Sequence, residues 1–158
     1  MNLCPSYKLC SIITLLILTE VILFTVSLCV GGIASNELLA VPTSSLVKLG
    51  AKDPYLMRNQ YQIWRFFTPM FLHVSLNHLL SNLISTIIIG PAIEESIGAV
   101  KFLTLYILSG IGGILFSALC TEDISCGAST AIYGLIGSYI AFLIVNWVYF
   151  KDHPEKKC

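Results

Sequence analysis

Three residues with side chains suited to hydrolysis stand near the starts of two strongly apolar segments. Ser129 follows Gly127 where the last apolar segment begins, and the start of a helix leaves backbone N–H groups unpaired and favours developing negative charge. His78 and Asn82 are four residues apart in an earlier segment, so they share one face of a helix. A serine nucleophile served by two side-chain donors for an oxyanion is one interpretation of this set.

Each motif also has a purely structural interpretation. A serine at a helix start is a common N-cap, and histidine and asparagine in a membrane segment can hold neighbouring helices together by hydrogen bonds. His73 and His78 are five residues apart, which does not place them on one helix face, and no carboxylate or thiol stands nearby in the sequence. We therefore expect no metal site and no cofactor.

The elements that position these residues are expected to be membrane helices. Hydrophobic residues make up 56% of the 158 residues and charged residues 11%, whereas soluble domains contain about 45–50% and about 25%. The apolar stretches predict an all-α, polytopic transmembrane bundle with four spanning helices, at about 9–33, 74–93, 102–119 and 127–150. An external loop at about 34–65 joins the first two. The net charge of zero offers no basic face for a nucleic acid.

Four spanning helices would place the starts of the second and fourth at the same membrane face. The lysines after the fourth segment weakly favour cytosolic termini, so His78, Asn82 and Ser129 are expected in one polar recess near the other face. Glu20 lies inside the first segment, where a charge is costly in lipid, so we expect it to face other helices or an aqueous cavity. The N-terminus lacks an Arg- and Ser-rich transit-peptide pattern, which favours the secretory pathway or plasma membrane over mitochondria.

The combined pattern resembles the rhomboid intramembrane serine proteases. It consists of Trp64-Arg65, then His73, His78 and Asn82, then Gly127-Ala128-Ser129, in matching order and spacing. The run Gly50 to Tyr55, which reads GAKDPY, adds a eukaryotic rhomboid character. The resemblance covers about residues 50–147 and predicts a single rhomboid-like membrane domain over residues 1–158.

The resemblance implies a serine endopeptidase that acts on transmembrane protein substrates in the bilayer. Ser129 would be the nucleophile, and His78, Asn82 and the Ser129 backbone N–H would form the oxyanion hole. The remaining residues would support this site: Gly127 gives the substrate backbone room, Tyr133 packs against the catalytic histidine, and His73, Trp64 and Arg65 complete the motif. Tryptophan and a snorkelling arginine would anchor the external loop at the membrane interface.

Two departures from the family pattern matter. Thr130 stands where members often have glycine, and its branched side chain is expected to narrow the pocket. The family has six or seven helices with the general-base histidine on the sixth, so we expect a truncated domain that is inactive alone. His153, 24 residues after Ser129, would lie about 36 Å farther along a helix, in the opposite aqueous phase. The alternatives are an inactive rhomboid-like protein that binds client membrane proteins, and an unrelated four-helix membrane protein.

Overall fold

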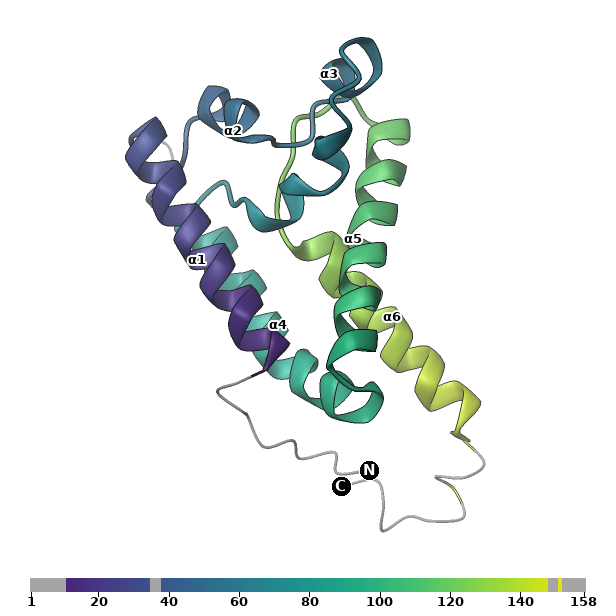
Figure 1. Ribbon diagram of the computed structural model, residues 1–158. Coiled ribbons are helices and arrows are strands. Elements are labelled where there is room, and N and C mark those ends of the chain that lie inside the picture. The colour runs from purple at the N-terminus through teal and green to yellow at the C-terminus, as the bar shows by residue number, and fades with distance from the viewer. Residues whose placement is uncertain (1–10, 35–37, 148–150, 152–158) are drawn as a thin grey trace.

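The computed structural model describes residues 11–34, 38–147 and 151. Within these ranges the protein is helical, and its two β-bridges are isolated. Long helices run side by side, while short helices gather beyond one end of the bundle (Figure 1). In chain order, the elements are α1 (Ile12–Gly31), α2 (Thr43–Leu49), α3 (Pro54–Asn59), η1 (Ile63–Phe66), η2 (Thr68–Phe71), α4 (Leu76–Ile97), α5 (Ala99–Cys120) and α6 (Ser129–Val145).

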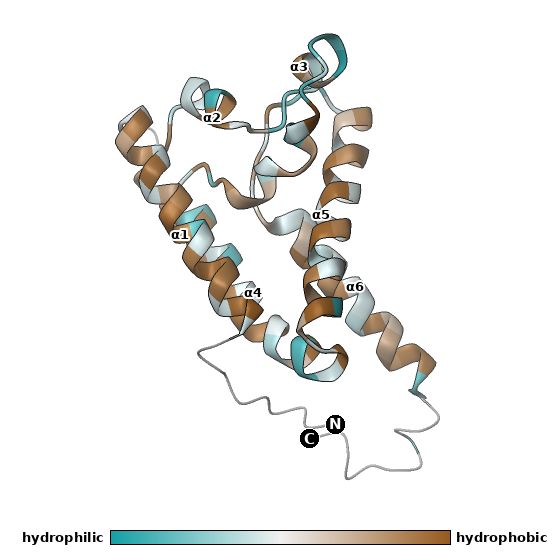
Figure 2. Cartoon of the chain, viewed as in Figure 1, coloured by the Kyte–Doolittle hydropathy of each residue, from teal (hydrophilic) through white to brown (hydrophobic). Residues whose placement is uncertain are grey.

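Three of the described helices are long and apolar enough to cross a bilayer. They are α1 with 20 residues and α4 and α5 with 22 each, close to the roughly 20 residues that a span needs. Figure 2 shows apolar residues along most of α1 and α5. The predicted fourth span corresponds to α6, which has 17 residues in the described part of the chain; residues 148–150 lie outside that part. The protein is therefore a polytopic helical membrane protein in which three spans, rather than four, are seen among the described residues.

Helix α4 continues beyond the predicted end at residue 93 and reaches Ile97 despite the internal Pro91. Glu94, the first residue beyond the predicted end, takes part in packing. Its carboxylate accepts hydrogen bonds from the backbone N–H groups of Ile12, at 3.0 Å, and Ile13, at 3.4 Å. These N–H groups open α1 and have no partner inside that helix, so Glu94 ties α1 to α4.

The predicted external loop contains short helices. We call residues 38–75 the connecting segment; it contains α2, α3, η1 and η2. Gly50 ends α2 with a φ of 106°, a conformation that glycine adopts without strain. Asp53 then caps α3 by accepting from the Leu56 N–H, and Pro54 occupies the first turn. Local capping residues thus divide the segment into short helices.

Helices α5 and α6 pack against each other along much of their lengths. A Cβ added to Gly134 would overlap Ser109 Cβ, and one added to Gly113 would lie 2.8 Å from Thr130 Cβ. Small residues therefore let these backbones approach, as expected for helices that pack without a hydrophobic driving force. The core beneath them is apolar and includes Phe102, Tyr106, Ala131 and Leu135.

Candidate active site

The loop that leads into α6 passes directly against α4. Gly127, in this loop, has a φ of 137° and donates its N–H to the carbonyl of Pro69 at 2.8 Å. A Cβ at position 127 would lie 2.5 Å from His78 Cε1, 2.9 Å from His78 Nε2 and 3.4 Å from Asn82 Nδ2. The structure thus brings the glycine two residues before Ser129 into contact range of both predicted oxyanion donors.

Ser129 is the first residue of α6, and the preceding Ala128, which is fully buried, takes the N-cap position. No side chain caps this helix, so the structural interpretation of Ser129 as an N-cap serine is wrong. Ser129 is half-buried, and the N–H groups of the first turn have no partner inside the helix. This position leaves a hydroxyl and a backbone donor at the edge of the protein interior.

Asn82 has an unusual hydrogen-bonding state. Its side chain is 5% exposed, yet its Nδ2 group has no hydrogen-bond partner among the described residues. A buried donor without a partner costs about 1–3 kcal/mol, and such groups require a reason. Because Nδ2 faces Gly127, it is available to a group bound beside the loop.

A buried polar cluster of His73, Glu20 and Tyr106 lies next to His78. The ring centroid of fully buried His73 lies 5.3 Å from that of His78, in an edge-on arrangement. Glu20 Oε2 lies 3.9 Å from His73 Nε2, and the Tyr106 hydroxyl donates to Glu20 Oε1 at 3.0 Å. Burial, with His78 adjacent, lowers the pKa of His73 to about 4, so this imidazole is neutral at physiological pH.

The expectation that Glu20 faces other helices is confirmed, because it is 1% exposed and contacts α5 through Tyr106. The tyrosine was not identified from the sequence, where a single Tyr in an apolar helix carries no sign of its partner. In the described part of the chain, no group of three or more His, Cys, Asp or Glu side chains could hold a metal ion.

The supporting residues lie in different environments. Arg65 is 4% exposed, so its predicted snorkelling at the interface is wrong. It instead donates to the carbonyl of Ala51 at 2.6 Å and to Gln62 Oε1 at 2.7 Å, which anchors the connecting segment from inside. Trp64 is 52% exposed and Tyr133 is 73% exposed. The packing of Tyr133 against a histidine stays a prediction.

Thr130 directs its side chain toward α5. Its Cβ and Cγ2 atoms occupy the space in which a Cβ of Gly113 would lie. The branched side chain therefore fills the space opposite Gly113 on α5. The expectation that Thr130 narrows the pocket stays a prediction.

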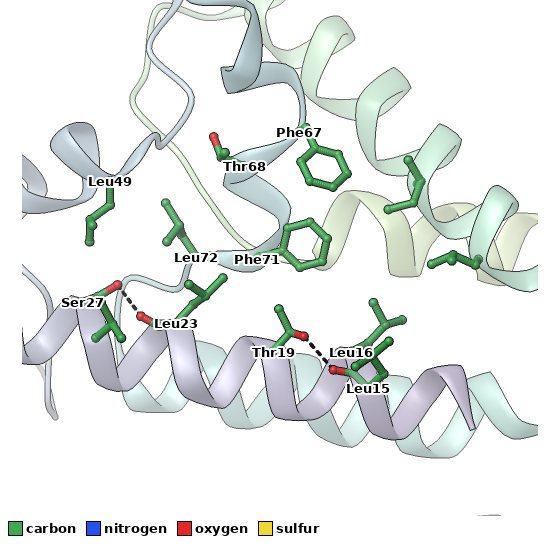
Figure 3. A pocket seen from close by; sticks show the side chains of 13 residues that line it. Leu15, Leu16, Thr19, Leu23, Ser27, Leu49, Phe67, Thr68, Phe71 and Leu72 are labelled. Atoms are coloured by element: carbon green, nitrogen blue, oxygen red, sulfur yellow. Dashed lines mark hydrogen bonds between the residues drawn. The ribbon is translucent and has the colours of Figure 1, made fainter. Parts of the chain in front are cut away.

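An apolar groove of about 570 Å³ lies elsewhere, between α1, the connecting segment and α5 (Figure 3). The hydroxyls of Thr19 and Ser27, which line it, donate back to carbonyls of α1. None of the predicted catalytic residues lines this groove, so it is separate from the candidate active site.

The fold and site define a polytopic membrane protein with serine, histidine and asparagine near helix starts on one side. The family model for the Rhomboid domain matches residues 60–156. The chain is 38% identical over 152 residues to Rhomboid-like protease 2 of Toxoplasma gondii, covering 95% of this chain and 53% of that protein. The chain belongs to the rhomboid family.

Two relatives from Arabidopsis thaliana carry other descriptions. The protein named RHOMBOID-like protein 6, mitochondrial, is 37% identical over 118 residues, covering 74% of this chain and 38% of its own length. The protein named Inactive RHOMBOID-like protein 8 is 34% identical over 117 residues, covering 73% of this chain and 33% of its own. The chain thus spans from a third to about half of the length of these three relatives.

Proposed function

We propose that this chain carries the nucleophile and the oxyanion hole of an intramembrane serine endopeptidase whose substrates are transmembrane proteins. The observation that carries the proposal is the position of Gly127 against His78 and Asn82, two residues before Ser129. Family membership and the similarity to a protein named as a protease support it. The proposed site requires no metal or cofactor.

In the proposed reaction, the Ser129 hydroxyl attacks the carbonyl carbon of the scissile peptide bond. Its proton passes to a general base, and the carbonyl oxygen becomes an oxyanion. His78 Nε2, Asn82 Nδ2 and the Ser129 N–H donate to that oxygen, and preorganised donors of this kind typically contribute about 10²–10³-fold each to the rate. The buried Nδ2 group of Asn82 fits this role because its partner would be present only during the reaction.

The general base is proposed to lie outside the described residues. His73 is fully buried next to Glu20, and His78 acting as the base would cease to be an oxyanion donor. His153 lies outside the described part of the chain. A serine without an adjacent base is a poor nucleophile, so we propose that the 158-residue chain alone cleaves transmembrane substrates extremely slowly.

A reconstitution experiment tests this function. The chain and a chimera are placed in liposomes with a transmembrane substrate; the chimera extends this chain with the C-terminal residues of Rhomboid-like protease 2 that follow the matched region. We expect cleavage by the chimera, none by the chain alone, and none by the chimera with Ser129→Ala. A folded chimera that does not cleave, or that cleaves equally with Ser129→Ala, would contradict the proposal.

A second candidate function is the binding of client membrane proteins without cleavage. The similarity to a protein named Inactive RHOMBOID-like protein 8 is the observation that favours this second function. Binding without cleavage would be supported if a transmembrane segment co-purifies with this chain and the chimera does not cleave that segment. Cleavage that depends on Ser129 would exclude it as the sole function.

The secretory pathway or plasma membrane is the proposed location, and the partners are transmembrane substrates and the lipid bilayer. Because one relative is named mitochondrial, fractionation against mitochondrial and secretory markers is the appropriate test. Co-fractionation with the mitochondrial marker alone would overturn this location.

A further inference from the structure

Lys52 is a buried lysine in the connecting segment. It is 1% exposed, and its ammonium donates to Ser117 Oγ at 2.8 Å and to Thr121 Oγ1 at 3.1 Å, both at the C-terminal end of α5. Burial lowers the pKa of Lys52, and the carboxylates of Asp123 and Glu122 oppose that change. A buried charge is stable only where it is paired or hydrogen-bonded, so the two hydroxyls fix its position.

The backbone of the same residue is attached to the same part of the chain. The Lys52 N–H donates to the carbonyl of Ser125 at 2.9 Å, and the Ser125 N–H donates to the carbonyl of Lys52 at 3.2 Å. We call residues 121–128 the nucleophile loop, because Ser129 follows it. Lys52 therefore holds this loop through its side chain at one end and through its backbone near the middle.

The connecting segment around Lys52 is itself fixed. The carbonyl of Ala51 accepts from Arg65 at 2.6 Å, and that of Gly50 accepts from Thr68 Oγ1 at 2.6 Å. The far end of the nucleophile loop is held by the hydrogen bond from Gly127 to Pro69. The loop is thus attached at both ends to a buried, hydrogen-bonded surface.

An ion pair joins the same two regions but lies in solvent. Arg58 pairs with Glu122, and the side chains are 53% and 69% exposed. Exposed pairs contribute little to stability. This pair therefore serves as an internal comparison for the buried contacts of Lys52.

We propose that Lys52 is a positioning residue that holds the nucleophile loop so that Gly127 stays against His78 and Asn82. Its effect on Ser129 chemistry rests on the proposed function, whereas its effect on the loop does not. The geometry assigns to the GAKDPY run the task of holding a loop that lies far from it in the sequence.

The test uses the full 158-residue chain in lipid nanodiscs, with Cys126 as the single cysteine. Cys126 is a free, half-buried thiol in the loop, and burial raises its pKa to about 12, so alkylation by N-ethylmaleimide should be slow. We expect Lys52→Met to accelerate alkylation about tenfold or more, because hydrogen bonds to a charged group are lost. Arg58→Gln, the matched exposed change, should alter the rate less than about twofold.

Two further measurements exclude general unfolding. Exposed Cys29 on α1, as the single cysteine, should react at the same rate with and without Lys52→Met. Thr121→Val removes one acceptor and should give a smaller acceleration, and it decides the case if Lys52→Met does not fold. Equal rates for Lys52→Met, Thr121→Val and the unchanged chain, or equal acceleration at Cys29, would overturn the proposal.

The catalytic meaning is tested separately in the chimera. Lys52→Met should lower kcat at least tenfold with little change in KM, and Lys52→Arg should restore part of the loss. Loosening of the loop with unchanged kcat would refute positioning of Ser129 and leave the proposed function standing. Cleavage that survives Ser129→Ala would refute the proposed function and leave the attachment of the loop standing.

Discussion

Gly127 lies so close to His78 that any side chain at position 127 would collide with the imidazole ring. A Cβ there would lie 2.5 Å from His78 Cε1, on a backbone whose φ of 137° already disfavours other residues. This relationship connects the start of α6 to the start of α4 and defines the candidate active site.

Gly127→Ala is therefore expected to destabilise the protein by about 1–3 kcal/mol and to displace His78. Gly112→Ala is the matched control, because a Cβ there meets nothing within 4 Å and alanine favours a helix by about 0.8–1 kcal/mol. Unfolding in mixed micelles measures both. Equal stability of the two variants would show that the contact with His78 is not as close as described.

Tyr106→Phe removes the donor to the buried carboxyl of Glu20. Hydrogen bonds between membrane helices contribute about 0.6 kcal/mol on average and up to about 1.7 kcal/mol to stability. We therefore expect Tyr106→Phe to lower the free energy of unfolding by an amount in this range. A double-mutant cycle with Glu20→Leu, which removes the acceptor, isolates the pair. A coupling energy of zero would mean that the two side chains do not interact in the membrane.

Gly113 and Thr130 should compensate for one another. Gly113→Ala introduces a methyl group 2.8 Å from Thr130 Cβ, and overpacking of this kind costs about 1–3 kcal/mol. Adding Thr130→Gly should recover much of that loss, whereas Thr130→Gly alone should leave a gap and destabilise the pair of helices. Thermal unfolding of the three variants provides the comparison, and strictly additive losses would contradict direct packing.

The stability of the fold should depend on pH through His73. Because the folded-state pKa of about 4 lies below the ordinary value of about 6.5, the unfolded chain binds this proton first as pH falls. Stability that is present above pH 6.5 should therefore decline as pH falls from about 6.5 toward about 4, by up to about 3 kcal/mol. His73→Phe, compared with the unchanged chain, should flatten this part of the profile of unfolding free energy against pH; identical slopes would exclude His73 as its source.

Much of the architecture was predictable because membrane helices are encoded by continuous apolar stretches. A shared site was predicted from the four-residue spacing of His78 and Asn82, the position of Ser129 at a segment start, and a helix topology that places both starts at one membrane face. The structure places Gly127, two residues before Ser129, against the side chains of His78 and Asn82. Local patterns of this kind depend on helix geometry alone.

Interactions between distant segments were not predictable in the same way. Lysine in a loop is usually exposed, so the sequence alone does not indicate that Lys52 is buried. Its burial becomes visible only through its contacts with α5. Arg65 was expected at the interface for the same reason, and Glu94 gave no sign that it would bind the start of α1. The identity of a tertiary partner is absent from local sequence, so such pairs emerge only with the fold.

The central claim is that Asn82 assists the reaction of Ser129. Its most direct test is the rate at which a fluorophosphonate modifies Ser129 in the liposome-reconstituted chimera, measured by mass spectrometry with and without Asn82→Ala. We predict an adduct on Ser129 that forms about 10²–10³-fold more slowly in the variant. An equal rate in both proteins, or an adduct on another residue, would contradict the claim.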